Sequence, residues 1–255
     1  MVILLGLTGT ALIGPLLLPF DPTTQGPDAL AAPGTGGHLL GTDEIGRDLF
    51  ARLLSGTRVD LLVTIIAVPI ATVVGTLLGL LDMVNGVLAS IVQRIFEVLL
   101  GVPGIILGIG VAMVIAPGIV SVIIAIVLIT APLFGRQARN ALLQQRSLDY
   151  VAAGEVLGYS RGRLVMRHIL PNITDVVFVR FAMETARAIT IEGSLSVIGL
   201  GIQSPQSSLG SMIEDGSGYL FDRPFYALAP VIVVVLLVFG CTILANALNK
   251  AVQRS

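Results

Sequence analysis

Long apolar runs separated by shorter polar segments dominate the pattern along this chain of 255 residues. Runs of about twenty apolar residues cross a bilayer as helices, because lipid offers no partner for exposed backbone N–H and C=O groups. We therefore predict six membrane-crossing helices. They are expected at about residues 2–20, 59–81, 89–115, 119–134, 173–191 and 226–248.

The third to fifth crossings depend on details of the pattern. Residues 98–135 carry no charge and are long enough for two crossings, so the turn is expected at Ala116-Pro117-Gly118. The fifth run is interrupted by four charged residues: Asp175, Arg180, Glu184 and Arg187. Small-residue pairs four apart allow close helix packing, and two such pairs are Gly75 with Gly79 and Gly104 with Gly108. Pro69 and Pro103 lie inside apolar runs, where proline can kink a helix.

The composition agrees with a membrane protein and excludes an ordinary soluble domain. Hydrophobic residues make up 55% of the chain and charged residues 12%, whereas soluble domains carry about 25% charged residues. The net charge of −1 gives no broad basic surface for nucleic acid. The lone Cys241 lies in an apolar run, so we expect a buried thiol and no disulfide framework.

The arginines predict the orientation in the membrane. Cytoplasmic loops carry an excess of Arg and Lys, and the loop between the fourth and fifth crossings holds Arg136, Arg139, Arg146, Arg161, Arg163 and Arg167. Alternation then places both termini in the cytoplasm and residues 21–60 outside. An alternative interprets residues 2–20 as a signal peptide, with Ala29-Leu30-Ala31 resembling a cleavage site. No basic residues precede that apolar run, so we expect a retained helix.

Residues 147–172 form a polar, Arg-rich island between apolar runs. The pattern predicts a short helix over 149–157, with Ser147 as its N-cap and Gly158 as its end. A second helical stretch is expected over 160–170, ending at Pro171. A basic loop that only fixes the topology is the alternative. The small and apolar face of the first helix favours instead a surface that docks in a groove of a partner.

Three segments resemble a known family. Residues 149–158, DYVAAGEVLG, followed by HILPN at 168–172, resemble the cytoplasmic coupling loop of ABC importer permeases. Residues 41–48 (GTDEIGRD), with 52–58 (RLLSGTR), are similar to the segment before the second helix in the dipeptide/oligopeptide/nickel branch. Residues 192–201 (EGSLSVIGLG) are similar to another family segment after the fifth helix. The resemblance covers most of residues 39–248.

This resemblance implies an all-α integral membrane fold, with six transmembrane helices of the MetI-like ABC importer permease type and a cytoplasmic coupling helix. The implied organisation is a first helix at 1–20, an extracytoplasmic loop with an amphipathic segment at 21–58, and a five-helix core at 59–249 that contains the coupling loop at 135–172. The implied location is the cytoplasmic (inner) membrane.

The resemblance also implies partners and a function. The chain is expected to pair with a second, homologous permease, two nucleotide-binding ATPase subunits and an extracytoplasmic substrate-binding protein, and to import di- or oligopeptides. Nickel or another small solute is the alternative cargo within the branch. The alternative from another class is a secondary transporter or membrane scaffold that works without ATP. It predicts inverted repeats, and the sequence contains no clear repeat.

The residues implied to couple the chain to its ATPase lie in the island. They are Asp149, Tyr150, Val151, Ala152, Ala153, Gly154, Glu155, Leu157 and Gly158. The family usually has Glu-Ala-Ala where this chain has Ala152-Ala153-Gly154. Docking is therefore expected to rest on shape, or on a charge from Asp149 or Glu155.

Three charged residues of the fifth run and one at its outer end form a second candidate site: Arg180, Glu184, Arg187 and Glu192. The first three are four and three residues apart and therefore share one helix face. They predict either an intrahelical ladder of ion pairs or a polar stripe facing the translocation path.

Several kinds of chemistry are excluded by the sequence. A Walker A loop requires Lys in GxxxxGK[ST], and the only Lys is Lys250 near the C-terminal end. The chain is therefore not an enzyme: we expect it to bind no cofactor and no metal itself, while partner subunits use ATP and Mg²⁺. His38 and His168 are expected on opposite sides of the membrane and so share no metal site; His168 is expected to cap or pack within the coupling loop.

Overall fold

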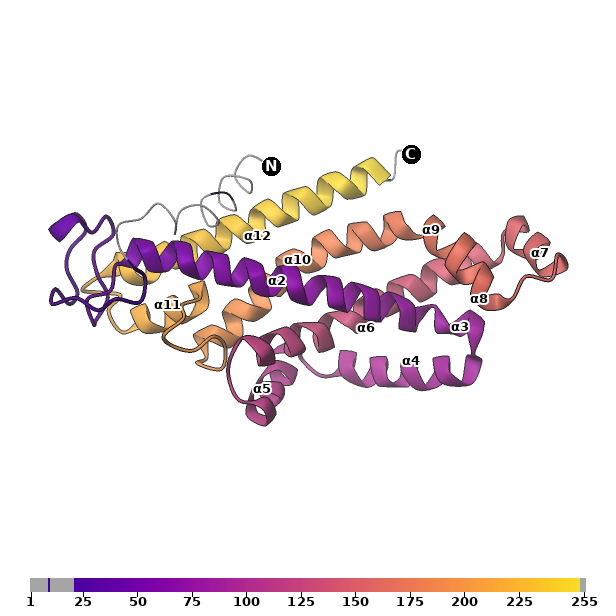
Figure 1. Cartoon of the computed structure of the whole chain (residues 1–255), viewed down its shortest axis with the longest axis horizontal. Coiled ribbons are helices and arrows are strands. Elements are labelled where there is room, and N and C mark those ends of the chain that lie inside the picture. The colour runs from indigo at the N-terminus through magenta and orange to yellow at the C-terminus, as the bar shows by residue number, and fades with distance from the viewer. Residues whose placement is uncertain (1–8, 10–20, 253–255) are drawn as a thin grey trace.

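Four long helices among the described residues run side by side and form the body of the molecule (Figure 1). They are α2 (Leu49–Gly79), α6 (Ile119–Arg146), α10 (Thr174–Val197) and α12 (Pro224–Val252). This computed structural model describes residue 9 and residues 21–252. The first predicted crossing, 2–20, lies outside the described residues.

Helices α2 and α6 make the most extensive helix–helix contact in the described part of the chain. Two glycines of α2 allow their backbones to touch: a Cβ on Gly75 would overlap the carbonyl oxygen of Ala131, and a Cβ on Gly79 would overlap that of Gly135. The close packing expected for the Gly75 and Gly79 pair is confirmed. These contacts fix α6 against α2 over several turns.

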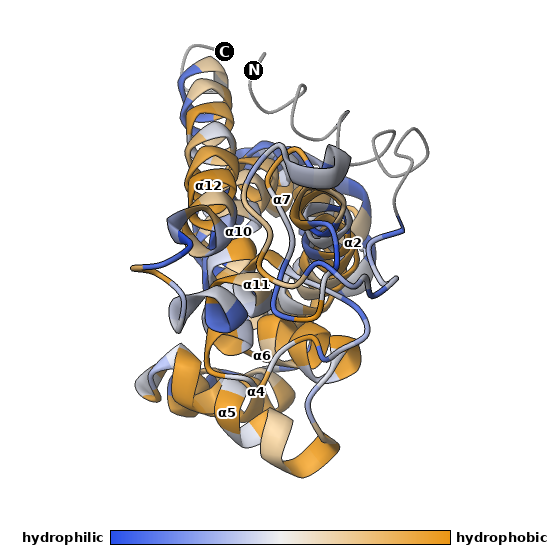
Figure 2. Cartoon of the chain, turned by 90° about the vertical axis from the view of Figure 1, so that its left-hand side faces the viewer, coloured by the Kyte–Doolittle hydropathy of each residue, from blue (hydrophilic) through white to orange (hydrophobic). Residues whose placement is uncertain are grey.

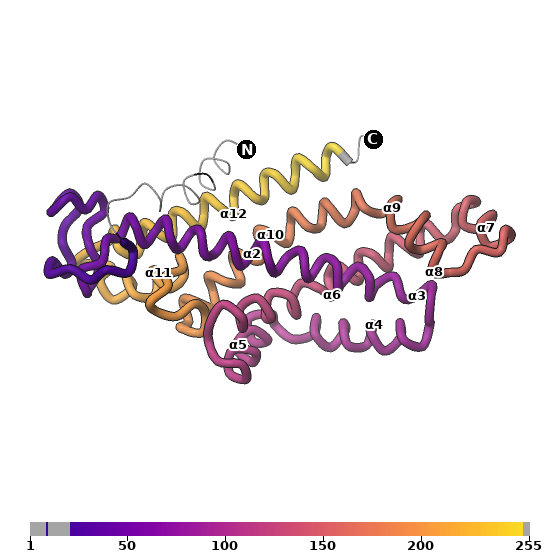
Figure 3. Tube along the Cα trace, in the orientation of Figure 1, coloured from indigo at the N-terminus to yellow at the C-terminus, as the bar shows by residue number. Residues whose placement is uncertain are grey.

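The predicted continuous helix over 89–115 is wrong. The chain instead forms α3 (Leu81–Val84), α4 (Gly86–Gly101) and α5 (Gly104–Ile115), and α5 is bent by 100° from α4. Figure 3 shows α5 turned aside from the long helices. Val102 is extended, with ψ of 133°, because a residue before proline is disfavoured in the helical region and Pro103 has no N–H to donate. The turn expected at residues 116–118 is confirmed between α5 and α6.

Two further helix boundaries differ from the predictions. Helix α2 begins at Leu49, so the predicted loop over 21–58 ends at Asp48, whose carboxylate accepts a 2.6 Å hydrogen bond from the Ala51 N–H as an N-cap. Helix α6 continues past Phe134 to Arg146. The polar residues after 135 therefore extend a helix rather than begin a loop.

Helical elements of the polar island follow α6. They are α7 (Asp149–Val156), α8 (Arg161–Leu164), a π-helical turn (Val165–Ile169) and α9 (Leu170–Asn172). At the other end of the molecule lie the 3₁₀ turn Thr35–Gly37 and α11 (Leu209–Ser217). The predicted stretch over 160–170 is thus helical but changes its hydrogen-bonding pattern after Leu164.

The apolar character of the helices supports membrane spans. By length and hydropathy, α6, α12 and the combined α2–α3 segment could each cross a membrane, and the bent α4–α5 pair passes the same criterion together. Figure 2 shows hydrophobic residues over α5 and α12 and hydrophilic ones concentrated in loops. Helix α10 packs within the bundle but is less apolar because of its charges. The count of six crossings stays a prediction.

Buried apolar side chains form three clusters along the bundle. A central cluster joins α2, α5, α6 and α10 around Val63, Val122 and Ile126. A second, at the end with α11, joins α2, α10, α11 and α12, and includes Tyr226. A third, around Leu164, joins α6 to α7 and α8. We call the two ends of the molecule the α11 end and the α7 end.

Candidate functional site

Helix α7 and its connection to α8 form the tip of the molecule (Figure 1). Ser147 was predicted as the N-cap of α7, and this is wrong: the N-cap is Leu148, and the Ser147 hydroxyl donates instead to the Gln144 carbonyl at 2.9 Å. Serine satisfies nearby backbone groups as readily in a turn as at an N-cap. Here it closes the C-terminal turn of α6.

The end of α7 is a Schellman motif. Gly158 has φ of 76°, its N–H donates to Glu155, and the Tyr159 N–H donates to Gly154, both at 3.0 Å. This 6→1 and 5→2 pairing satisfies carbonyls at the helix end and requires a left-handed residue, which glycine adopts at little cost. The predicted stop at Gly158 is confirmed, and it directs the chain back beneath α7.

The buried face of α7 rests on α8. Val151 and Gly154 are buried, and a Cβ on Gly154 would lie 2.5 Å from a methyl carbon of Leu164. Leu164 itself belongs to the apolar cluster that contains Leu142 of α6. The Tyr150 hydroxyl donates to the Gln145 side chain at 2.7 Å. The small residue at 154 therefore lets α7 lie close to a surface continuous with the bundle.

The outer face of α7 is open and mostly apolar. Val156 is 88% exposed and Leu157 70% exposed. The remaining predicted coupling residues divide between the faces: those on the exposed face are Asp149, Ala152, Ala153 and Glu155. Two large apolar side chains on a short helix at the tip of a molecule are suited to contact with another protein.

His168 packs against the turn that follows α7. Its ring stacks on Tyr159 with ring centroids 5.8 Å apart, and the Arg163 guanidinium carbon lies 5.5 Å from the centre of the Tyr159 ring. The expectation that His168 packs within the loop is confirmed. Aromatic and cation–π contacts of this kind hold α8 to the turn.

The charged residues of α10 do not act as one group. Arg180 and Glu184 form an ion pair at 2.8 Å, which agrees with the predicted pairing along the helix. Arg187 is exposed and forms no ion pair with the described residues. Glu192 is fully buried and accepts a hydrogen bond from the Ser196 hydroxyl at 2.7 Å. It lies within α10 rather than after it, so the placement of residues 192–201 beyond the fifth helix is wrong for its first part.

The α11 end contains a buried ionic cluster that the sequence analysis missed. The Asp43 carboxylate accepts from Arg47 Nε at 2.5 Å and from Arg52 Nη1 at 2.6 Å, and Arg52 Nη2 donates to Asp215 of α11 at 3.0 Å. Tyr226 of α12 donates to Glu44. We call Asp43, Glu44, Arg47, Arg52, Asp215 and Tyr226 the ionic cluster. Its signal in the sequence was the dense run of charges over 43–52, just before an apolar run.

A cavity of about 260 Å³ adjoins this cluster. Its lining includes Glu44, Arg52, Ser196, Glu214 and Asp215. Glu214 is exposed, but desolvation by the atoms around its carboxyl, followed by the charge of neighbouring Asp215, raises the pKa of that carboxyl. The cavity is therefore predominantly acidic at its α11 side.

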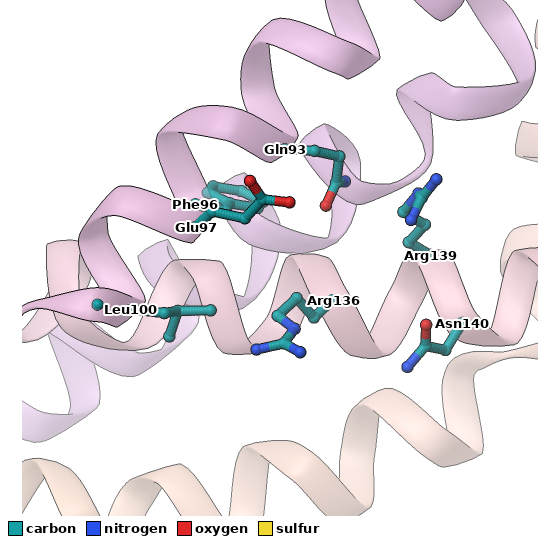
Figure 4. A pocket seen from close by; sticks show the side chains of 8 residues that line it. Gln93, Phe96, Glu97, Leu100, Arg136, Arg139 and Asn140 are labelled. Atoms are coloured by element: carbon teal, nitrogen blue, oxygen red, sulfur yellow. The ribbon is translucent and has the colours of Figure 1, made fainter.

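A second cavity, of about 450 Å³, lies between α4 and α6. Figure 4 shows Phe96 and Glu97 on α4, with Arg136, Arg139 and Asn140 on α6. Arg139 pairs with Asp82 at 3.3 Å and Glu97 with Arg94 at 2.9 Å. Arg136 forms no ion pair within the part of the chain that the structure describes. A polar cavity between apolar helices can accommodate a charged solute or a charged side chain of another subunit.

Comparison with known proteins assigns a family to this chain, whose described residues form long apolar helices with a short helix at one tip. Residues 61–255 match the family described as binding-protein-dependent transport system inner membrane component, and the chain belongs to that family. It is thus a permease subunit of the ABC importer type, without an ATPase motif of its own.

Relatives and solved structures are similar over most of the chain. The probable D,D-dipeptide transport system permease protein DdpC of Escherichia coli K12 is 32% identical, covering 93% of this chain and 80% of that protein. The dipeptide transport system permease protein DppC of Haemophilus influenzae is 31% identical, covering 95% and 85%. An inward-facing structure of the MetNI methionine ABC transporter has a TM-score of 0.65 at 19% identity, covering 80% of this chain and 97% of that one. This last likeness confirms the MetI-like fold.

Proposed function

We propose that this chain is one of two homologous permease subunits that together form the translocation path of an ATP-driven importer for di- and oligopeptides. The observation that carries the proposal is α7: a short helix at one tip, with Val156 and Leu157 exposed and a packed support beneath it. The peptide cargo is supported by the names of relatives that are dipeptide permeases and cover most of the chain.

The α7 end faces the cytoplasm in this proposal, in the inner membrane, with both termini on the cytoplasmic side. The Arg-rich segment that contains α8 supports this orientation. Partners are the second permease, two ATPase subunits that bind ATP and Mg²⁺, and an extracytoplasmic substrate-binding protein that meets the α11 end. This chain binds no cofactor or metal itself.

Movement passes from the ATPase to the bundle through apolar contacts. Docking on Val156 and Leu157 moves α7, and Gly154 seated on Leu164 carries that movement into the cluster shared with Leu142 of α6. Because packed side chains leave little free space, a displacement of α7 shifts its support rather than being absorbed. ATP binding then biases the bundle between inward- and outward-facing states.

The proposal assigns two roles to the charges of α10. The Arg180–Glu184 pair stabilises α10 within an apolar surrounding. Arg187, which is exposed, faces the path or the second permease. Glu192 is buried and takes part in neither role.

Uptake into reconstituted vesicles tests the whole proposal. The chain is co-expressed with its neighbouring permease, ATPase and binding-protein genes, purified and placed in liposomes with ATP inside. Uptake of a labelled dipeptide that requires both ATP and the binding protein is expected. ATP-dependent uptake of Ni²⁺ but not of dipeptides would show that the cargo is nickel and not peptide. Uptake by the chain alone without ATP would indicate a secondary transporter.

Val156→Asp tests the docking surface. The substitution places a charge where an apolar contact is proposed, so at least tenfold loss of transport-coupled ATPase activity is expected, since a charge buried in an interface costs about 2 kcal/mol or more. Met166→Asp is the matched control, because Met166 is also apolar and exposed at the α7 end but lies outside α7. Equal loss in both variants, or none in Val156→Asp, would contradict the role of α7.

A further inference from the structure

Two acidic side chains meet in the interior of the bundle near the α11 end. Asp60 belongs to α2 and Glu192 to α10, and both are 0% exposed. Both carboxyl groups reach the first turn of α11: Asp60 accepts from the Leu209 N–H, and Ser196, which donates to Glu192, lies against Gly210. Isolated ionised carboxylates are costly in an apolar interior, and two in contact cannot both carry a charge without strong repulsion.

One oxygen of each of the two carboxyl groups accepts a hydrogen bond from another residue. Asp60 Oδ2 accepts from the backbone N–H of Leu209, at the start of α11, at 3.2 Å. Glu192 Oε1 accepts from the Ser196 hydroxyl at 2.7 Å. The remaining oxygens, Asp60 Oδ1 and Glu192 Oε2, form no hydrogen bond with the described residues. Each carboxyl group therefore has one buried oxygen left for a proton shared with the other group.

The groups around the pair offer no compensating cation. Contacts from α10 and α11 come from the neutral Ser196 and Ser208 hydroxyls and the Leu209 N–H. No Arg, Lys or His of the described residues forms an ion pair with either carboxylate. Glu184, another buried carboxylate of α10, shows the contrast, because it pairs with Arg180 at 2.8 Å.

We infer that Asp60 and Glu192 bind one proton between them, and that this shared proton joins α2 to α10 beneath the N-terminus of α11. The pair is therefore a buried proton-binding site with a net charge of about −1, written as one carboxylic acid donating to one carboxylate. The short, charge-assisted hydrogen bond that results links three helices at one point.

Infrared spectroscopy of the purified complex at neutral pH tests this inference. A protonated carboxyl absorbs as a C=O stretch separate from the carboxylate bands, and it shifts in D₂O. We expect one such buried band in the wild type. It should shift when the carboxyl carbons of Asp or of Glu are labelled with ¹³C, and it should vanish in the double variant Asp60→Asn/Glu192→Gln. Glu184→Gln should leave it unchanged.

The labelling experiment uses the unaltered chain, so it does not depend on a variant that folds. A wild-type spectrum with no buried carboxylic acid band would overturn the inference, and so would a band that persists in the double variant. A further outcome distinguishes a bound cation. If Na⁺ or Ca²⁺ raises the melting temperature of the wild type but not of Asp60→Asn, a cation occupies the site and the shared proton is refuted.

Discussion

At the α11 end, side chains of opposite charge meet in the interior, whereas the α7 end is joined by apolar side chains. Asp43, Arg52 and Asp215 connect the loop before α2 to α2 and α11 through directed hydrogen bonds. Val151 and Leu164 connect α7 to the bundle by packing alone. A buried ionic cluster tolerates little displacement because each bond has a fixed geometry. An apolar contact can transmit force yet allow sliding, which suits the end proposed to move with the ATPases.

Removing Asp43 is the most severe way to break this comparison. Asp43→Ala leaves Arg47 and Arg52 short of their shared acceptor in a buried position. Breaking a buried ionic network in this way costs about 3–5 kcal/mol. A correspondingly large fall in thermal stability of the purified complex is expected. Glu97→Ala is the control, because the Arg94–Glu97 pair is 81% and 65% exposed and exposed pairs contribute about 0–1 kcal/mol. Similar losses of thermal stability in both variants would show that the ionic cluster contributes no more than an exposed ion pair.

Leu164→Ala tests the apolar support at the α7 end. The change opens a cavity beneath Gly154, and such truncations cost about 2–5 kcal/mol. We expect the loss to be local, with faster amide hydrogen exchange in α7 and weaker coupling of ATPase activity to transport. Amides of α11 should be unaffected. Leu148→Ala, at an exposed apolar position of the same segment, should change little. Exchange that increases equally at both ends would mean that the two ends are not independent.

The elements of the α7 end were largely predictable from the sequence because they depend on local chemistry. Gly158 indicated a left-handed stop, and its φ of 76° agrees. Ser147 was wrongly predicted as the N-cap of α7, because a serine hydroxyl bonds backbone groups equally well in a turn and at an N-cap. Pro103 lay inside a predicted helix, but its 100° bend also depends on packing of Gly104 against Ile129 and of Gly108 against Leu195, contacts that the sequence does not display.

The α11 end could not be predicted in the same way. The ionic cluster joins Asp43 and Arg52 to Asp215 and Tyr226, which are far away in the chain. Asp60 similarly meets Glu192 only because α2 and α10 pack together. Charge spacing along one helix predicts neighbours four residues apart, as for Arg180 and Glu184. It contains no information about which helices lie side by side.

Gly158→Ala sharpens the comparison by altering backbone strain without altering packing. A Cβ at this position meets nothing within 4 Å, so the cost comes from the left-handed conformation, about 1–2 kcal/mol. We expect a small local loss in α7, smaller than that of Leu164→Ala. The matched control is Gly162→Ala, in the nearby α8, which has ordinary helical φ and open space for a methyl group. That substitution should be neutral or slightly stabilising.

Glu214→Gln is expected to have the smallest effect and a distinctive pH dependence. Local desolvation and then the charge of Asp215 raise the pKa of the exposed Glu214 carboxyl in the folded chain above its ordinary value. Ionised Glu214 therefore opposes folding slightly at neutral pH, and this penalty disappears as the pH falls through its raised pKa toward the value in the unfolded chain. The Gln variant should melt slightly higher than the wild type at neutral pH, with the difference lost in acid. Glu155→Gln, which removes an exposed carboxyl at the α7 end, is the matched control. If the higher melting temperature of Glu214→Gln persists at acidic pH, the gain does not come from removing the charge of Glu214. The acidic groups at the α11 end would then be balanced by the positive charges near them.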